Sequence, residues 1–285
     1  MSNRRDFLKT TAALAAASMI LPLGAFTQEK KTIGLQLYTV RDLIKQDLKS
    51  TLEKLARIGY NSIEAAGYNA TDNTFYGMDI KSFVDFVNGL GMPLNSSHTV
   101  FELDAAEKVI GAAAAAGAKY IIYPFLAEPF RTNLDGWKVT AEKFNKMGEI
   151  AKKNGIRFGY HNHAFEFEKK DGQIPYDILL SQTDPSLVTF EMDLYWVTRG
   201  GQNPLDYFKK YPGRFELWHV KDMVKTDDMF FAPVGTGRID FAGIFAEKKS
   251  AGMKYFFVEQ DSFKNMDPIQ AVEISYKYLN SSKFI

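Results

Sequence analysis

The chain has 285 residues, of which 46% are hydrophobic and 24% are charged, and it contains no cysteine. This composition is typical of a soluble globular protein with one large domain or two small ones. A formal net charge of +1 provides no basic surface for nucleic acid, so we do not expect such a partner. The lack of cysteine excludes disulfides and thiolate sites, so any metal must be held by His, Asp or Glu.

The first residues predict an export signal. Arg4 and Arg5 are followed by Phe7, Leu8 and Lys9, and then by an apolar run over 10–26 that is short for a membrane span. This pattern resembles a twin-arginine signal. We expect residues 1–27 to be the signal, residues 28–285 to form the folded domain in the periplasm, and no stable membrane insertion after cleavage. The alternative is an N-terminal membrane anchor.

From residue 31 onward, a helical stretch, a glycine and a short apolar run recur. A glycine at such a place suits the left-handed end of a helix before a strand. The glycines are Gly59, Gly91, Gly117, Gly155, Gly213 and Gly252. Strands are predicted at 32–37, 61–65, 92–97, 119–124, 156–163, 187–193, 214–220 and 254–259, with helices between them that include 42–58, 137–153 and 204–210.

Eight such βα units fit the roughly 250 residues of a (β/α)₈ barrel. A doubly wound sheet would carry a glycine-rich phosphate loop after the first strand, yet residues 38–42 contain no glycine. The sequence therefore predicts one α/β domain, a (β/α)₈ TIM barrel.

All four histidines fall at predicted strand ends, where barrels of this kind carry their active sites. His98 follows the third strand, His161 and His163 end the fifth, and His219 ends the seventh. Alternation along a strand places His161 and His163 on one face. Carboxylates share these strand ends: Glu64, Glu191, Asp193, Glu259 and Asp261. We therefore predict a site for one divalent cation (Mn, Zn, Co or Mg), against the alternative of a polar rim without metal.

Three further features have two interpretations each. Lys221 is either an acid/base or substrate-contacting residue, or the partner of Asp222. Trp196, Trp218 and Tyr38 either stack on a sugar ring or pack under loops. The loop 234–241 either cradles an anion with Arg238 as its charge, or opens a helix with Asp240 as N-cap.

Five motifs together make the chain resemble the xylose-isomerase-like TIM barrels, which include sugar isomerases, epimerases, related lyases and an apurinic endonuclease branch. The motifs are YHNH (160–163), FEMD (190–193), WHVKD (218–222), GTGRIDF (235–241) and FVE (257–259). The resemblance implies metal ligands at Asp193, His219 and Glu259. His161 stands where the family commonly has Glu, and is the expected fourth ligand. Trp196 stands where many relatives have a further His.

The activity that the resemblance implies is isomerisation or epimerisation through proton removal beside a sugar carbonyl. Catalytic roles would fall to Glu259, His163, Lys221 and Glu191, and substrate contacts to Glu64, His98, Trp196, Arg238 and Tyr38. Export favours free sugars, oligosaccharides or oxidised glycosides over sugar phosphates. The alternatives are a keto-glycoside lyase or hydratase and a carbohydrate-binding barrel without catalysis, while the near-neutral charge disfavours the nuclease branch.

Overall fold

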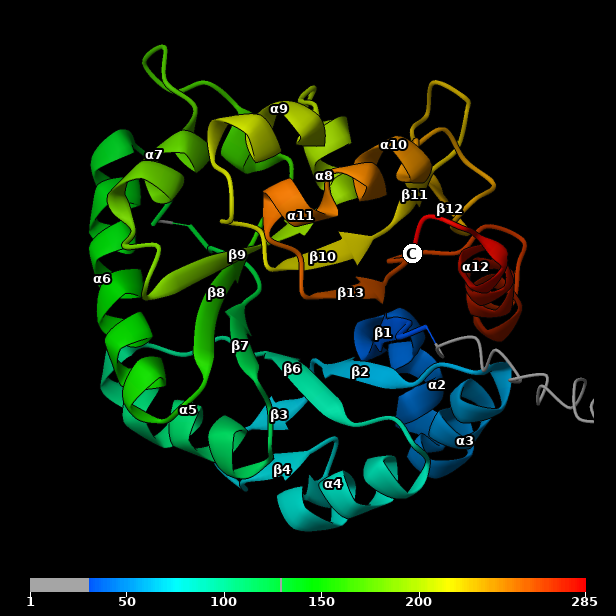
Figure 1. Cartoon of the computed structure of the whole chain (residues 1–285). Helices are drawn as coiled ribbons and strands as arrows, with labels where there is room; N and C mark the ends of the chain where they lie inside the picture. Colours follow the sequence, from blue (N-terminus) through cyan, green and yellow to red (C-terminus); the bar gives the residue numbers. More distant parts are fainter. Residues whose placement is uncertain (1–30, 129) are drawn as a thin grey trace, which may run out of the picture. The chain divides into compact units, whose positions relative to one another are not determined.

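The computed structural model describes residues 31–128 and 130–285. Eight parallel strands close into a barrel, and Gly34 of the first strand pairs with both Ser62 and Phe257 (Figure 1). The barrel strands are β1 (Gly34–Gln36), β2 (Ser62–Ala65), β6 (Leu94–His98), β7 (Tyr120–Tyr123), β8 (Arg157–His161), β9 (Val188–Asp193), β10 (Leu217–Val220) and β13 (Tyr255–Val258). Each predicted strand overlaps one of these, so the predicted TIM barrel is confirmed. The expected signal, residues 1–27, lies outside the described residues.

Helices form the outer layer between successive strands (Figure 1). They are α2 (Arg41–Gln46), α3 (Leu48–Ile58), α4 (Ile80–Gly89), α5 (Ala106–Ala115), α6 (Leu134–Lys153), α7 (Pro175–Gln182), α8 (Leu194–Arg199), α9 (Pro204–Lys210), α10 (Phe241–Ala246), α11 (Lys248–Ala251) and α12 (Pro268–Ser281), with 3₁₀ turns η1 (Leu37–Val40), η2 (Leu103–Ala105) and η3 (Phe165–Phe167). No helix of the described ranges is both long and apolar enough to cross a bilayer.

The predicted helix over 42–58 is two helices in the structure. Asp47 has an extended backbone between them, and its carboxylate accepts a hydrogen bond from the Ser50 N–H at 3.0 Å, which caps α3. An aspartate in this position starts a new helix. The α6 helix begins three residues before the predicted position 137, because Asn133 caps it. The α9 helix has the predicted bounds.

All six glycines that the repeated pattern singled out have positive φ angles. Gly252, with φ 84°, ends α11 in the left-handed conformation, and a Cβ there would lie 2.9 Å from the backbone of Gly213. Only glycine satisfies both demands at this αβ connection. The pattern therefore located the helix ends correctly.

Two small antiparallel sheets were not predicted. One is formed by β3 (Tyr68–Asn69), β4 (Thr74–Phe75) and β5 (Met78–Asp79), between β2 and α4, and the other by β11 (Asp222–Met223) and β12 (Phe231–Ala232). Strands of two residues are too short for a periodic pattern in the sequence. The first sheet adds Tyr68 to the mouth of the barrel.

The barrel interior changes from apolar to polar along the strands. An apolar cluster fills one level, and a Cβ at Gly34 would collide with the ring of Phe257 in it. Because strand side chains alternate, the next inward position on β10 after Leu217 is His219, and the position that follows Phe257 is Glu259. The cluster is Tyr120, Ile122, Leu217 and Phe257. The apolar level thus forms a floor under a polar level at the carboxyl ends.

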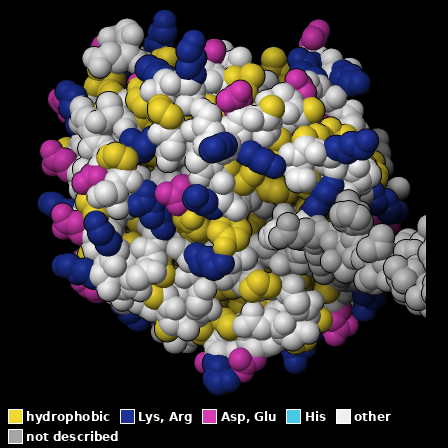
Figure 2. Space-filling model, viewed as in Figure 1, with side chains coloured by type: hydrophobic (Ala, Val, Ile, Leu, Met, Phe, Trp, Pro, Cys, Tyr) yellow, Lys and Arg dark blue, Asp and Glu magenta, His cyan; other side chains and the backbone are white. Residues whose placement is uncertain are grey.

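The histidines belong to this interior level. His161 and His219 are buried, and His98 and His163 are partly buried. The face shown in Figure 2 accordingly carries scattered Lys, Arg, Asp and Glu side chains and no visible histidine.

Candidate metal centre

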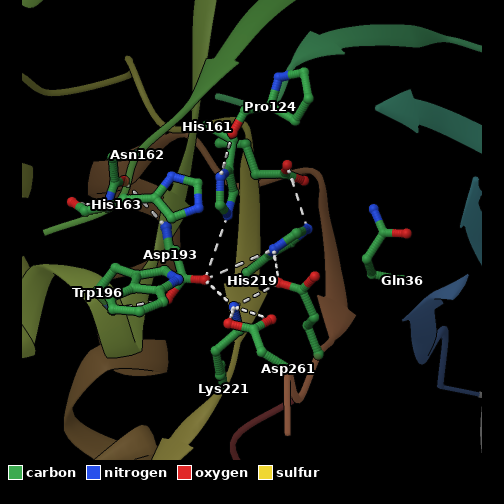
Figure 3. Close-up of polar contacts among 12 residues, drawn as sticks. Gln36, Pro124, His161, Asn162, His163, Asp193, Trp196, His219, Lys221 and Asp261 are labelled. Atoms are coloured by element: carbon green, nitrogen blue, oxygen red, sulfur yellow. Dashed lines mark hydrogen bonds and ion pairs between the residues drawn. The ribbon is translucent and has the colours of Figure 1, made fainter. Parts of the chain in front are cut away.

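Four side chains from neighbouring strands converge at the carboxyl end of the barrel interior (Figure 3). They are His161 of β8, Asp193 of β9, His219 of β10 and Glu259, which follows β13. Each offers one nitrogen or oxygen atom, and the four atoms lie within 4.8 Å of one another. These are the residues that the sequence predicted as ligands. The structure brings them together, and their ligand role stays a prediction.

The donor atoms of this four-residue set fit a divalent cation. His219 Nδ1 lies 2.7 Å from Glu259 Oε2, and the Lys221 ammonium lies 2.7 Å from the same oxygen. His161 Nδ1 lies 3.2 Å from the carbonyl oxygen of Pro124, and its Nε2 lies 3.3 Å from Asp193 Oδ2. Ionisable groups buried this closely together are stable only when they are paired with one another or bound to an ion. Two imidazoles and two carboxylates suit first-row divalent metals.

Burial and nearby charges determine the protonation of this set. Burial, aided by His219, lowers the pKa of His161 well below its usual value. Burial acts against the negative charge of Glu259, but Lys221 and His219 bring its pKa well below the ordinary range. Burial also opposes a charge on His219, yet carboxylates, Glu191 foremost, raise its pKa well above normal. Neutral imidazole and ionised carboxylate are the metal-binding forms, so binding of an ion would displace a proton from His219 into solvent.

Glu64 contacts the ring nitrogen of His219 that lies away from the other three residues of the set. Its Oε2 lies 2.6 Å from His219 Nε2 and accepts a hydrogen bond from Gln36 Nε2 at 2.8 Å, while its Oε1 accepts one from Ser96 Oγ at 2.5 Å. With Nε2 engaged in this way, Nδ1 is the ring nitrogen that faces the four-residue set. A carboxylate behind a histidine ligand commonly fixes the ring in this manner.

The predicted substrate contact of Glu64 and the predicted catalytic role of Glu191 stay predictions that the geometry does not favour. Both are fully buried, and neither lines the pocket at the barrel mouth. Glu191 Oε2 lies 2.5 Å from Nε2 of His98. Burial raises the pKa of Glu191 to about 7 and lowers that of His98 to about 4. Strand alternation predicted the face of these residues but not their depth.

Lys221 lies among three carboxylates. Its ammonium is 2.9 Å from Asp193 Oδ2, 2.7 Å from Glu259 Oε2 and 3.1 Å from both oxygens of Asp261 (Figure 3). Burial disfavours the charge, but these three acids raise the pKa of Lys221 well above its normal value. Lys221 is therefore a permanent cation in the site, and Asp222 is not its partner.

Asp222 instead closes the glycine loop 234–241. Its Oδ2 accepts hydrogen bonds from the N–H groups of Gly235 at 3.0 Å and Gly237 at 2.8 Å. Arg238 donates to backbone carbonyls between β11 and β12 and does not line the pocket. Asp240 caps α10. The geometry therefore favours the alternative, in which the loop opens a helix, over an anion cradle with Arg238 as a substrate-binding residue.

His163 forms the edge of the site beside aromatic rings. Its ring stacks on Phe165 with centroids 5.6 Å apart and lies 5.4 Å from the ring of Trp196. Burial lowers the pKa of His163 to about 2, and its Nδ1 makes no hydrogen bond. Glu166 accepts hydrogen bonds from the His163 N–H at 2.9 Å and the Tyr160 hydroxyl at 2.6 Å, so it fixes the loop that carries His163.

A pocket of about 640 Å³ opens above the ionic residues. Tyr38, His98, His163, Lys221 and Glu259 line it, as the sequence predicted for residues in contact with a substrate. Trp196 is behind His163 and is not part of the lining. The full lining is Tyr38, Arg41, Ala66, Tyr68, His98, Thr99, Val100, Pro124, Phe125, His161, His163, Lys221, Glu259, Asp261 and Ser262.

Sequence reasoning left Asp261, Glu166 and Phe125 out of the site. For Asp261 a signal was present, because it lies two residues beyond Glu259 and was expected on the same face. Glu166 follows a strand by several residues in a 3₁₀ turn, where no periodicity applies. Phe125 is an aromatic residue in a loop, and nothing in the sequence shows that its ring is exposed at the mouth.

Comparisons with known proteins begin at the N-terminus. Residues 1–20 match the twin-arginine translocation pathway signal sequence. The chain is therefore exported by the twin-arginine pathway, as predicted.

Curated relatives include inosose dehydratases. That of Clostridium botulinum (strain Alaska E43 / Type E3) is 30% identical over 48% of this chain and 52% of its own. That of Clostridium perfringens (strain 13 / Type A) is 29% identical over 57% of this chain and 58% of its own. The chain thus spans about half the length of the curated relatives it matches.

A crystal structure described as a sugar phosphate isomerase/epimerase from Parabacteroides distasonis has a TM-score of 0.82 and 30% identity, covering 92% of this chain and 97% of that one. A protein described as IOLI with a bound zinc atom shares the fold, with a TM-score of 0.69 at 15% identity over 90% of this chain and 99% of that one. The dehydratase and isomerase/epimerase names are those of enzymes that act on carbohydrates, and the zinc-containing protein shows the fold alone. Residues 52–281 match the family described as xylose isomerase-like TIM barrel, and the chain belongs to that family.

Proposed function

We propose that the chain binds one divalent cation through His161, Asp193, His219 and Glu259. The observation that carries this proposal is the convergence of two imidazoles and two carboxylates, all buried, with one donor atom from each within 4.8 Å of the others. Two nitrogen donors favour Zn, Mn or Co over Mg, which prefers oxygen ligands.

The reaction that we propose is proton removal from the carbon beside the carbonyl of a carbohydrate, followed by isomerisation or epimerisation. A bound divalent cation supplies polarisation of a carbonyl or hydroxyl oxygen. Among the five described carboxylates of the cluster, only Glu259 and Asp261 line the pocket. Both oxygens of Asp261 contact Lys221. We therefore assign proton removal to Glu259.

Lys221 and His163 are the two further residues to which we assign a role in the reaction. The ammonium of Lys221 lies 2.7 Å from Glu259 and lines the pocket, so it can stabilise negative charge on a substrate oxygen. His163 lines the pocket beside His161, with ring centroids 5.0 Å apart. Its ring, which burial keeps neutral, can hydrogen-bond a substrate hydroxyl.

Elimination of water or of a glycosidic oxygen is a second candidate. Lys221 favours it, because an ammonium beside the base can stabilise negative charge on a leaving oxygen. The curated relatives named inosose dehydratase support the same chemistry. Both candidates begin with the same proton removal.

The test is an exchange experiment in D₂O on the purified protein, with metal content measured before and after chelation. A panel of keto-sugars, inososes and keto-glycosides is incubated, and mass spectrometry follows deuterium at the carbon beside the carbonyl. We expect about one metal per chain and metal-dependent exchange, with a released group only in elimination. A protein that binds no metal and catalyses no exchange would be a carbohydrate-binding barrel, and the proposal would fail.

A further inference from the structure

The pocket at the barrel mouth has two chemically different sides. Strands β8, β10 and β13 and the residues after them supply its ionic side, and the residues after β1, β2, β6 and β7 supply an apolar side. The ionic side consists of His161, His163, Lys221, Glu259 and Asp261. The apolar side consists mainly of Tyr38, Ala66, Tyr68, Val100, Pro124 and Phe125, and the polar residues Arg41, His98 and Thr99 line the pocket among them.

Of the five exposed large hydrophobic residues in the described ranges, three lie on the apolar side of the pocket. Tyr38 is 44% exposed, Val100 61% and Phe125 39%. Beyond these three, the large hydrophobic residues described as exposed are Val139 and Met229, which do not line the pocket. Apolar groups gathered at one polar-rimmed cavity mark a ligand site.

Two of the three aromatic rings of the apolar side, those of Tyr38 and Phe125, are held in place by neighbouring residues. Arg41 lies over the Tyr38 ring at 4.2 Å and donates a hydrogen bond to the Tyr38 carbonyl at 3.0 Å. Phe125 meets the His163 ring edge to face, with centroids 5.4 Å apart and an angle of 89°. Rings fixed in this way offer contact area at little entropic cost.

The cations of the pocket lining are already engaged, which argues against a phosphate group. Arg41 donates to the backbone oxygens of Tyr38 and Asp261, at 3.0 and 2.9 Å, and Lys221 is surrounded by carboxylates. The carboxylates Glu259 and Asp261 lie at the same mouth and would repel an anion.

We propose that the apolar side is a subsite for an uncharged ring with an apolar face, attached to the sugar unit that reacts on the ionic side. The inference rests on the proposed function and specifies its substrate class as a glycoside. The ring can be an aromatic aglycone or a second sugar, because both present an apolar face to an aromatic side chain. A sugar phosphate does not have this chemistry.

The experiment compares ligands that differ only in the attached group. Calorimetry measures binding of methyl and 4-nitrophenyl glycosides of α- and β-glucose and of α- and β-galactose, and of cellobiose, maltose and lactose. In at least one pair we expect the ring-bearing ligand to bind about tenfold or more tightly than the methyl glycoside. Preference for the aryl ligand identifies an aromatic aglycone, and preference for a disaccharide identifies a second sugar. Equal affinities throughout would overturn the inference.

Substitutions show which side chains cause the preference for the ring-bearing ligand. Phe125→Ala and Tyr38→Ala are expected to reduce it at least about threefold each, and Val139→Ala, which removes an exposed side chain elsewhere, to leave it unchanged. Loss in Val139→Ala to the same extent would mean unspecific adsorption and would contradict the subsite.

Failure of the subsite can be told from failure of the reaction. Glu259→Gln changes only the ionic side, so we expect it to keep the ring preference while metal-dependent exchange is lost. A protein that catalyses exchange on simple sugars but shows no ring preference would refute the subsite alone.

Discussion

The ionic and apolar sides of the pocket differ in how deeply their side chains are buried. Lys221 on the ionic side is buried and contacts three carboxylates, whereas Val100 on the apolar side is 61% exposed. A fully buried charge is stable only when it is paired with opposite charges. An apolar side chain, in contrast, can stay exposed to solvent until a ligand covers it. The difference indicates that one side is organised for chemistry and the other for recognition.

The strongest test of this division is Glu259→Gln, which removes one charged donor and keeps the side-chain shape. We expect metal affinity to fall by more than about 100-fold, beyond what loss of a supporting partner costs. Calorimetric titration with Zn²⁺ and Mn²⁺ measures the effect. Glu216→Gln is the matched control, because Glu216 is a carboxylate before β10, away from the pocket lining. Equal affinity in both variants would remove Glu259 from the site.

Glu64→Gln tests whether the contact between Glu64 and His219 contributes to metal binding on the ionic side. The amide cannot accept hydrogen bonds on both of its terminal atoms, so the His219 ring is less firmly oriented. We expect metal affinity to fall by roughly 10- to 100-fold. The same titration checks this, with circular dichroism to show that the barrel is folded. Unchanged affinity would make Glu64 a structural residue only.

The sequence predicted the convergence of the ionic side because strand alternation and barrel geometry determine which residues point inward at the carboxyl ends. That rule placed the strand-end histidines and carboxylates at one mouth, and the resemblance to the xylose-isomerase-like barrels singled out Asp193, His219 and Glu259 among them, with His161 as the fourth ligand. Glu64 and Glu191 obey the same rule but lie deeper, and depth depends on how the strands are staggered around the barrel. A pattern within one strand contains no information about stagger.

Features that depend on contacts between distant segments could not be predicted from the sequence. Two interpretations of loop 234–241 were equally compatible with its glycines, and the choice between them lies with Asp222, whose carboxylate accepts the loop N–H groups. The apolar side was likewise unpredicted apart from Tyr38. Exposure of Phe125 depends on the neighbouring loops and not on its own sequence context.

Glu166→Gln tests, through the pH dependence of the free energy of unfolding, whether Glu166 is protonated where it supports the loop of His163. Burial raises the pKa of Glu166 from 4.5 to about 8, so the folded protein keeps a proton that the unfolded chain releases. This contribution to stability is present in full below pH 4.5 and is lost as the pH rises through 8. From pH 6 to 8 we expect the wild-type free energy of unfolding to fall by about 2 kcal/mol relative to the variant.

Urea unfolding at several pH values measures this difference, because other titrating groups contribute equally to both proteins. Glu168→Gln, an exposed neighbour, is the control and is expected to follow the wild type. Parallel curves for the wild type and Glu166→Gln would show that Glu166 is ionised in the folded protein.

The smallest effect is expected from Val100→Ser on the apolar side. Because the side chain is mostly in water already, its loss should change the free energy of unfolding by less than about 0.5 kcal/mol. Metal affinity should not change, since Val100 follows β6 and the four proposed ligands come from β8 to β13. Urea unfolding and metal titration of the same preparation check both points. Destabilisation by more than 1 kcal/mol would mean that the apolar side supports the fold, and the contrast between a deeply buried ionic side and an apolar side kept for a ligand would no longer stand.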